Sequence, residues 1–214
     1  MKYFSPVSFA LLLLLTPVAM AEKNLDAGEK LFNQFCEECH GEGGNNLKKS
    51  SSKIPSIAGF SSFSILESLA QFVEKSRPAL EIISNNNKKK TMYMISKKIT
   101  QEQSEEIAYY LSKQKFIAVT QKIITEEMND AYETGESVHQ DLCESCHGDK
   151  GTSVEDDTPI LKGQRKEYLE RQFEQFTKYQ RAMPRRMKRK FNKLSEAEKQ
   201  AVIVFYTRSK TANK

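Results

Sequence analysis

The sequence predicts an all-α fold made of two small helical domains in tandem, and three observations support this. Apolar residues recur in each half at the three- and four-residue spacing of helices, no segment alternates convincingly in the manner of a strand, and blocks of residues in the first half recur in the second. The 214 residues are therefore expected to form two related folding units.

The repeat is clearest around the cysteines. A Gly-Glu pair stands eight residues before Cys36, and another stands eight residues before Cys143, at an offset of 107 residues. Later blocks match at offsets of 104 and 95 residues, so the loops between the blocks differ in length. We predict domains at 22–118 and 131–214 with a connecting segment at 119–130, and the apolar residues around this segment predict that it packs against one or both domains.

Three helices are expected in each half. The first ends at the cysteines, the second carries apolar and aromatic residues at helical spacing, and the third begins with a capping box, in which a Thr or Ser is followed three residues later by Gln or Glu. The expected ranges are 25–36, 62–76 and a helix after Thr100 in the first half, and 132–143, 165–180 and a helix after Ser195 in the second.

The first 21 residues predict a secretory signal peptide. Lys2 provides a positive start, Phe9–Leu15 is a short apolar stretch, and Ala19-Met20-Ala21 is a small-x-small cleavage site. The apolar run is shorter than the roughly 20 residues that cross a bilayer, so we expect cleavage near Ala21 and export to the periplasm. An uncleaved N-terminal anchor is the alternative.

All four cysteines of the chain lie in two copies of the motif C-x-x-C-H, the attachment signature of c-type haem. Two thiols three positions apart can each form a thioether with one haem vinyl group, and the next histidine then lies where it can bind the iron. We therefore predict two covalently bound haem c groups. The predicted attachment residues are Cys36, Cys39, Cys143 and Cys146, and the predicted iron ligands on this side are His40 and His147.

Two other uses of cysteine pairs fit less well. A four-cysteine zinc ribbon does not explain the 103 residues between the pairs or the histidine after each pair. A thioredoxin-like redox pair needs a βαβ context, and neither pair follows a strand-like run. Two haems also explain how a chain with only 38% hydrophobic residues encloses a core, and we expect that the chain without haem does not fold stably.

On these features the chain resembles the class I cytochromes c. The shared features are a first helix with a glycine before C-x-x-C-H, a Pro-x-x-x-Gly loop, and a last helix with paired aromatic residues. Two such domains in tandem resemble the dihaem cytochromes c of the c-four type, to which the cytochrome subunit of flavocytochrome c sulfide dehydrogenase is related. The resemblance covers nearly all of 22–214 and implies that the carbonyls of Pro55 and Pro159 accept a hydrogen bond from the haem-ligating histidines.

The resemblance also implies a methionine as the second axial ligand of each iron. Met92 and Met187 both stand seven residues before the residue that precedes a capping box, which is where the family places its methionine. A neutral thioether sulfur raises the reduction potential. His139, the remaining histidine, stands on the first helix of the second half, so we expect a packing or surface role for it rather than iron ligation.

Alternatives to these two methionines stay open. Met94 and Met183 also lie in the loops before the third helices, but they have no counterpart in the other half. The proline that often precedes the ligand in this family is missing before Met92 and Met187, whereas Met183 adjoins Pro184. A packing role is the other interpretation of Met92 and Met187.

The loops that carry these methionines are strongly basic. Five lysines and no acid lie between Asn85 and Lys98, and seven cations and no acid lie between Arg181 and Lys193. In class I cytochromes c this loop borders the exposed haem edge, so the resemblance implies redox protein partners with acidic docking faces, which such a patch attracts. Loose association with anionic lipid at a membrane surface and ordinary solvated charge are alternatives, and no nucleic acid partner is expected.

These features predict a periplasmic electron carrier with no catalytic residues. It would transfer single electrons between respiratory redox partners, toward a membrane terminal oxidase. The alternative is the electron-accepting cytochrome subunit of a dehydrogenase, such as flavocytochrome c sulfide dehydrogenase. A haem enzyme in its own right would need an iron with an open coordination position, which two methionine ligands would close.

Overall fold

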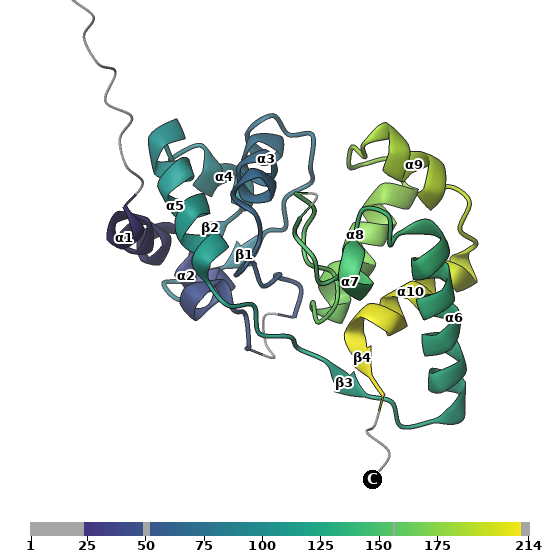
Figure 1. Ribbon diagram of the computed structural model, residues 1–214. Coiled ribbons are helices and arrows are strands. Elements are labelled where there is room, and N and C mark those ends of the chain that lie inside the picture. Colours follow the sequence, from purple (N-terminus) through teal and green to yellow (C-terminus); the bar gives the residue numbers. More distant parts are fainter. Residues whose placement is uncertain (1–23, 49–51, 156, 211–214) are drawn as a thin grey trace, which may run out of the picture.

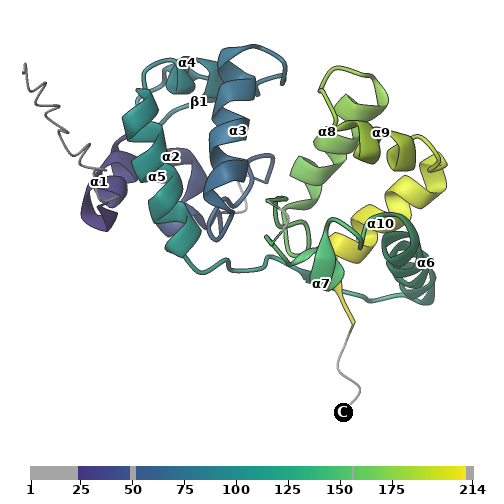
Figure 2. The same ribbon diagram turned by 45° about the horizontal axis from the view of Figure 1, so that its top comes forward.

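The computed structural model describes residues 24–48, 52–155 and 157–210, so the predicted signal peptide at 1–21 lies outside the described residues. Within this part of the chain the fold is mostly helical, and the two halves lie side by side as separate groups of helices (Figure 1, Figure 2). The predicted all-α class and the tandem arrangement are confirmed. No helix in the described ranges is long and apolar enough to cross a membrane.

The first half is organised around three helices. α1 (Leu25–Phe35) and α3 (Ser62–Val73) both pack against α5 (Gln101–Lys113). α1 begins because the Asn24 side chain accepts hydrogen bonds from two backbone amides of the first turn, and α5 begins at the predicted capping box. The short elements are α2 (Glu37–His40), the 3-10 turn η1 (Glu42–Gly44), α4 (Met92–Ser96) and the strands β1 (Ile82–Ile83) and β2 (Lys89–Lys90).

The second half repeats this arrangement. α6 (Glu126–Leu142) and α8 (Lys166–Thr177) both pack against α10 (Glu196–Thr207). α10 begins at the second predicted capping box, Ser195 with Glu198. The short elements are α7 (Gly148–Gly151), α9 (Arg185–Phe191) and the strands β3 (Gln121–Lys122) and β4 (Arg208–Ser209).

The structure contains short elements that the prediction of three helices per half omitted. α4 and α9 form within the basic loops: the Thr91 side chain accepts a hydrogen bond from the Met94 amide and caps α4, and Pro184 precedes α9. β1 pairs antiparallel with β2, and β3 pairs parallel with β4, but strands of two residues are too short to produce an alternating pattern. α6 begins before the expected residue 132 because Thr125 caps it.

Two glycines lie where the first and last helices of each half pack closely. At Gly135 on α6, a Cβ atom would lie 2.1 Å from the Ala201 carbonyl oxygen of α10. At Gly28 on α1, a Cβ atom would lie 2.4 Å from the Glu106 carbonyl oxygen of α5. Any side chain at either position would force the helices apart. The glycines of the repeat therefore mark where the first and last helices of each half touch.

The stretch from Lys115 to Lys122, which contains the start of the connecting segment at 119–130, contacts both halves. On the first half, the Asn45 side chain donates to the Lys115 carbonyl at 3.0 Å and accepts from the Ile117 amide at 2.8 Å. On the second half, the Val119 amide donates to the Gly163 carbonyl at 2.7 Å, and β3 pairs with β4. Hydrogen bonds with the Asn45 side chain thus hold this stretch to the first half, and backbone hydrogen bonds hold it to the second.

Buried polar side chains join the two halves directly. The Gln164 side chain accepts a hydrogen bond from the Ser56 amide at 3.2 Å and donates to the Ser56 carbonyl at 2.7 Å. The Arg165 guanidinium donates to the backbone carbonyls of Asn46 and Lys48. The loop before α3 therefore lies against the start of α8.

Candidate haem sites

The first C-x-x-C-H motif consists of Cys36, which follows α1, and the four residues of α2. Cys36 follows α1, and its carbonyl accepts hydrogen bonds from the amides of Cys39 at 3.1 Å and His40 at 3.0 Å. All three residues line one cavity, with about 1200 Å³ of empty space including its open mouth. Burial, and then the neighbouring Cys39, raise the pKa of the Cys36 thiol to about 12. The structure thus brings both cysteines and the histidine to one apolar cavity.

His40 is held in an orientation that suits iron ligation. The ring is buried, and Nδ1 donates a hydrogen bond to the Pro55 carbonyl at 3.0 Å, as the family resemblance implies. Burial lowers the pKa of His40 below its ordinary value, although the Pro55 carbonyl opposes this shift, so the ring is neutral at pH 7. In this tautomer the Nε2 lone pair is available to a metal.

Met92 lies on the wall of the same cavity, at the start of α4. Met94, the alternative in this half, is 44% exposed and is absent from the cavity wall. Of these two methionines, Met92 is therefore the one that shares a cavity with His40. Ligation of the iron by Met92 remains a prediction.

Three arginines line the cavity without a carboxylate partner. Arg77 is a buried residue of the first half, and Arg171 and Arg181 are half-buried residues of the second. Within the described residues none of the three forms an ion pair, and the buried Nε atoms of Arg171 and Arg181 make no hydrogen bond. Burial, and then the charge of Arg77, lower the pKa of Arg181 to about 10. Because unpaired buried cations are unfavourable, the cavity suits an anionic group. The two carboxylates of a haem are such groups, and the apolar walls suit its ring.

The wall of this cavity is shared between the two halves. The Arg77 guanidinium donates to the Tyr168 hydroxyl at 3.1 Å and to the Gln172 side-chain oxygen at 3.2 Å. Arg181 donates to the same oxygen at 2.6 Å, and Pro159 also lines the cavity. Our sequence reasoning did not place Tyr168, Gln172 or Arg181 at this site, and it expected Pro159 only at the second site. The one signal was that Arg77 and Arg181 match at the offset of 104 residues, which does not show that they meet.

The second motif forms the same turn after α6. The Cys143 carbonyl accepts hydrogen bonds from the amides of Cys146 at 3.1 Å and His147 at 2.9 Å. Burial, and then the nearby His139, lower the pKa of His147 to about 4, and the Pro159 carbonyl opposes this shift. Within the described residues, however, the buried Nδ1 of His147 has no hydrogen bond of good geometry. Pro159 therefore approaches His147 without making the bond that Pro55 makes with His40.

The two candidate methionines of the second half lie close together. Met187 belongs to α9, and Met183 stands two residues before that helix. Both are half-buried and pack against the core cluster of the second half. Their packing does not distinguish them, so the assignment of Met187 as the ligand remains a prediction.

Comparison with known proteins identifies the family of both halves. The family model described as Cytochrome c matches residues 25–115, and the model described as Cytochrome C oxidase, cbb3-type, subunit III, matches residues 130–205. The two matches together span most of the chain, and each contains one C-x-x-C-H turn. The chain belongs to the dihaem class I cytochromes c. This dihaem cytochrome accordingly carries two covalently bound haem c groups and functions in electron transfer.

Solved structures show the same two-domain fold. Reduced recombinant cytochrome c4 from Pseudomonas stutzeri has 21% identity and a TM-score of 0.66, with 86% of this chain and 98% of that chain covered. Cytochrome c4 from Acidithiobacillus ferrooxidans has 21% identity and a TM-score of 0.62, with 81% and 98% covered. Thiosulfate dehydrogenase from Marichromatium purpuratum has 19% identity and a TM-score of 0.66, with 86% of this chain and 40% of that chain covered. No curated protein sequence matches the dihaem cytochrome.

Proposed function

We propose that this dihaem cytochrome is exported to the periplasm and carries single electrons between respiratory redox partners, toward a membrane terminal oxidase. The observation that carries the proposal is the shared wall of the first cavity. Pro159 approaches His147 of the second site and also lines the cavity that contains His40. The two sites therefore adjoin, which suits transfer of an electron from one half to the other. When bound, haem supplies the one-electron chemistry of its iron.

The residues of the first site favour a carrier over an enzyme. We propose that His40 and Met92, which line one cavity, would bind the iron of the first haem, and with both bound no coordination position would remain for a small substrate. Pro55 keeps the imidazole in one orientation, so little rearrangement is needed when the iron changes its charge. Arg77 and its neighbours supply positive charge to the haem carboxylates.

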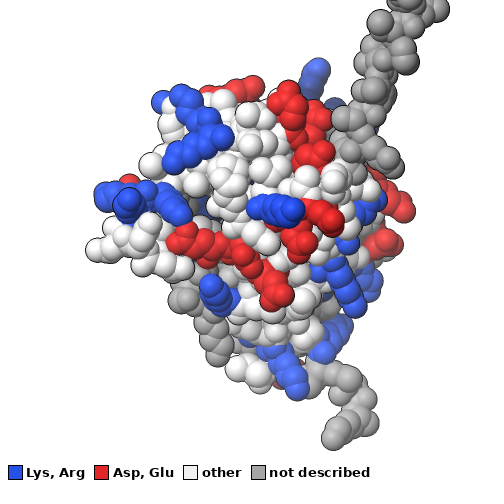
Figure 3. Space-filling view, turned by 90° about the vertical axis from the view of Figure 1, so that its left-hand side faces the viewer, with Lys and Arg blue, Asp and Glu red and all other residues white. Residues whose placement is uncertain are grey.

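The basic residues of α9 form the surface that we propose for partner docking. In the described structure, none of its five cations pairs with a carboxylate. The basic loop of the first half differs, because Lys89 pairs with Glu81 at 2.9 Å and Lys90 contacts the Glu38 carboxylate. On the outer face of the first half, cationic and acidic side chains are interspersed (Figure 3). The α9 surface consists of Arg185, Arg186, Lys188, Arg189 and Lys190.

Reversing the charge of Arg185, Arg186 and Arg189 to glutamate is expected to slow association with an acidic redox partner by about tenfold or more at low ionic strength. Unpaired cations attract such a partner over a distance that salt shortens, from about 30 Å at 0.01 M to about 3 Å at 1 M. Stopped-flow electron transfer measured across this salt range tests the expectation, and wild type and variant should converge at the highest salt. Stability should hardly change, because exposed charges contribute little to folding.

The matched control reverses three lysines of the first half, two of which are already neutralised by a carboxylate. A smaller effect on the rate is expected for this control. Equal rates for both variants and the wild type at every salt concentration would contradict docking through α9. The three control residues are Lys88, Lys89 and Lys90.

A second candidate function is that of an electron-accepting subunit of a dehydrogenase. The thiosulfate dehydrogenase from Marichromatium purpuratum supports it, because this chain matches 40% of that longer chain in fold. Flavocytochrome c sulfide dehydrogenase represents the same class. Gentle purification of the native protein separates the two functions, since a carrier is isolated as a single polypeptide and a subunit is isolated with its dehydrogenase partner.

A further inference from the structure

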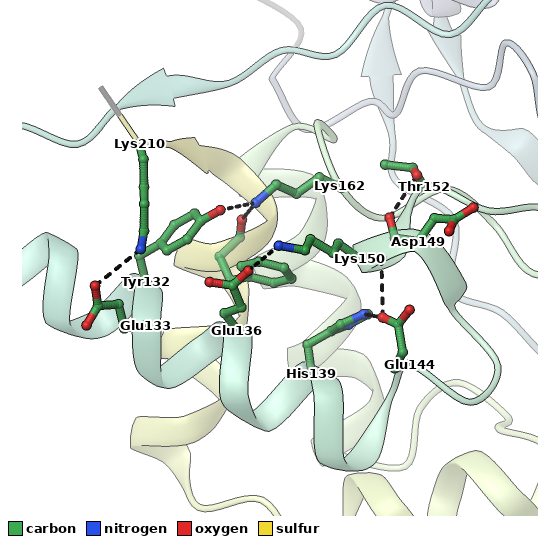
Figure 4. A network of polar contacts seen from close by, with 11 residues as sticks. Tyr132, Glu133, Glu136, His139, Glu144, Asp149, Lys150, Thr152, Lys162 and Lys210 are labelled. Atoms are coloured by element: carbon green, nitrogen blue, oxygen red, sulfur yellow. Dashed lines mark hydrogen bonds and ion pairs between the residues drawn. The ribbon is translucent and has the colours of Figure 1, made fainter. Parts of the chain in front are cut away.

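A buried histidine in the second half belongs to a polar network that the proposed electron transfer does not use. His139, on α6, is 1% exposed, and its Nδ1 lies 2.7 Å from the Tyr206 hydroxyl of α10. Its Nε2 contacts the carboxylate of Glu144, which stands between the two cysteines of the second motif (Figure 4). The Glu144 side chain is 38% exposed, so the pair connects solvent with the interior beside Cys143.

This network satisfies His139 in either protonation state. In the neutral ring, Nε2–H donates to Glu144 and Nδ1 accepts from the Tyr206 hydroxyl. In the protonated ring, Nδ1–H donates to the Tyr206 oxygen, because a hydroxyl group is both donor and acceptor. Burial lowers the pKa of His139 below its ordinary value, although Glu144 opposes this shift, so the ring is neutral at pH 7.

The other charged groups around His139 come from several elements. Glu136, one turn earlier on α6, is paired with Lys150 of α7 at 2.7 Å, and the Lys150 amide donates to Glu144 at 3.2 Å. The positive charge of Lys162, in the loop before α8, lowers the pKa of His139, whereas the negative charge of Glu144 raises it. No hydrogen bond joins His139 to His147. The titratable groups nearest to His139 are Glu136, Glu144, Lys162, Tyr206, Cys143 and His147.

The first half provides an internal comparison because it has no such pair. At the offsets of the repeat, His139 corresponds to Phe32 and Tyr206 corresponds to Leu111, and both residues of the first half are fully buried and apolar. The correspondence holds in the structure, since a loop glycine amide donates to the carbonyl of Leu111 at 2.9 Å and of Tyr206 at 2.7 Å. The first half keeps a carboxylate, Glu37, at the position of Glu144 but has no histidine, so within the described residues the histidine–carboxylate pair borders the second site alone.

We propose that His139 and Glu144 form a proton-binding site that takes up a proton when the second haem accepts an electron. The inference rests on the proposed function, because it requires that the second haem be reduced and reoxidised. The pair lies beside the haem attachment site, since the His139 carbonyl accepts a hydrogen bond from the Cys143 amide at 2.7 Å and Glu144 directly follows Cys143. An added electron places negative charge near the ring, and a weakly polar interior transmits this field with little screening. The electron comes from the redox partner. The proton comes from a hydronium ion of the solvent, whose O–H bond breaks and releases water as the N–H bond forms at Nδ1 of His139.

The expected result is a pH-dependent reduction potential for one haem only. A proton that binds more tightly to the reduced form is lost as pH rises, which disfavours reduction. The reduction equilibrium of this haem should therefore change by up to about tenfold per pH unit, while that of the other haem stays constant. Spectroelectrochemical titration of the holoprotein between about pH 5 and pH 9 measures both potentials. Proton uptake on reduction in weakly buffered solution, followed with an indicator dye, is the second readout.

Three variants test the assignment. His139→Phe copies Phe32 of the first half and should abolish the pH dependence and the proton uptake. Glu144→Gln should move the pH-dependent range to lower pH, because it removes the negative charge that favours the protonated ring. Glu133 lies on α6, as His139 does, and pairs with Lys210 at the surface; Glu133→Gln breaks this ion pair and should leave the range unchanged.

Three results would overturn the proposal: pH-independent potentials in the wild type, an unchanged slope in His139→Phe, or an unchanged range in Glu144→Gln. If His139→Phe does not bind two haems, Glu144→Gln decides the question. Failure of the proposed function looks different, because the haems would then not titrate as reversible one-electron centres at any pH.

Discussion

Replacing Cys36 and Cys39 with serine is expected to remove one of the two haems and to unfold the first half. Both residues line a cavity whose other walls include unpaired arginines, so loss of the haem leaves a large void and uncompensated charge. A domain of this size has little core to offset such a loss. The Soret absorbance per chain should fall by about half, the intact mass should fall by one haem, and thermal unfolding followed by circular dichroism should lose one transition.

The matched variant replaces Cys143 and Cys146 and should remove the other haem. Because the second half supplies part of the wall of the first cavity, this variant is also expected to weaken haem binding in the first half. Replacing Cys36 and Cys39 should weaken haem binding in the second half less, since the buried residues of the core cluster of the second half all come from that half. Retention of two haems in either variant, or zinc in place of haem in the wild type, would refute the attachment sites.

Replacing Met92 with alanine is expected to open the iron of the first haem to external ligands. Alanine has no sulfur and does not span the space that the methionine side chain fills beside the cavity. The reduced variant should bind carbon monoxide at one haem where the wild type binds none, and its reduction potential should fall because the thioether is gone. The weak near-infrared band of sulfur-to-iron charge transfer in the oxidised protein should lose about half of its intensity.

The second half needs two variants, because Met183 and Met187 pack against the same core. Met187→Ala is expected to let carbon monoxide bind at the iron of the second haem. Met183→Ala is expected to leave that iron unable to bind carbon monoxide. Met94→Ala is the control for the first half, since that side chain is exposed. Carbon monoxide binding by Met183→Ala, together with none by Met187→Ala, would show that the ligand of the second haem is Met183.

Much of the fold and of the haem-binding turns could be predicted from the sequence, because these features depend on residues close together in the chain. In each C-x-x-C-H motif the first cysteine's carbonyl accepts hydrogen bonds from the amides three and four positions later, so the turn is formed by neighbouring residues. The capping boxes at Thr100 and Ser195 form as predicted for the same reason. The repeat likewise identified two domains, since both copies must bury the same helix faces.

Short elements escaped this local reasoning. α4 and α9 are only a turn or two long, so their apolar residues do not complete a helical period. The parallel pairing of β3 with β4 joins residues near 121 and 208, and no spacing within either segment reveals such a partner.

The composition of the haem sites was decided by the tertiary structure. Arg77 meets Tyr168 across 91 positions, and the choice of Met92 over Met94 as the residue on the cavity wall depends on how α4 packs. His139 looked like an ordinary packing histidine, yet packing of α6 against α10 places it between Tyr206 and Glu144. Local periodicity specifies which face of a helix is buried, but the residues that meet that face are selected by long-range packing, and the chemistry of both haem sites lies at such contacts.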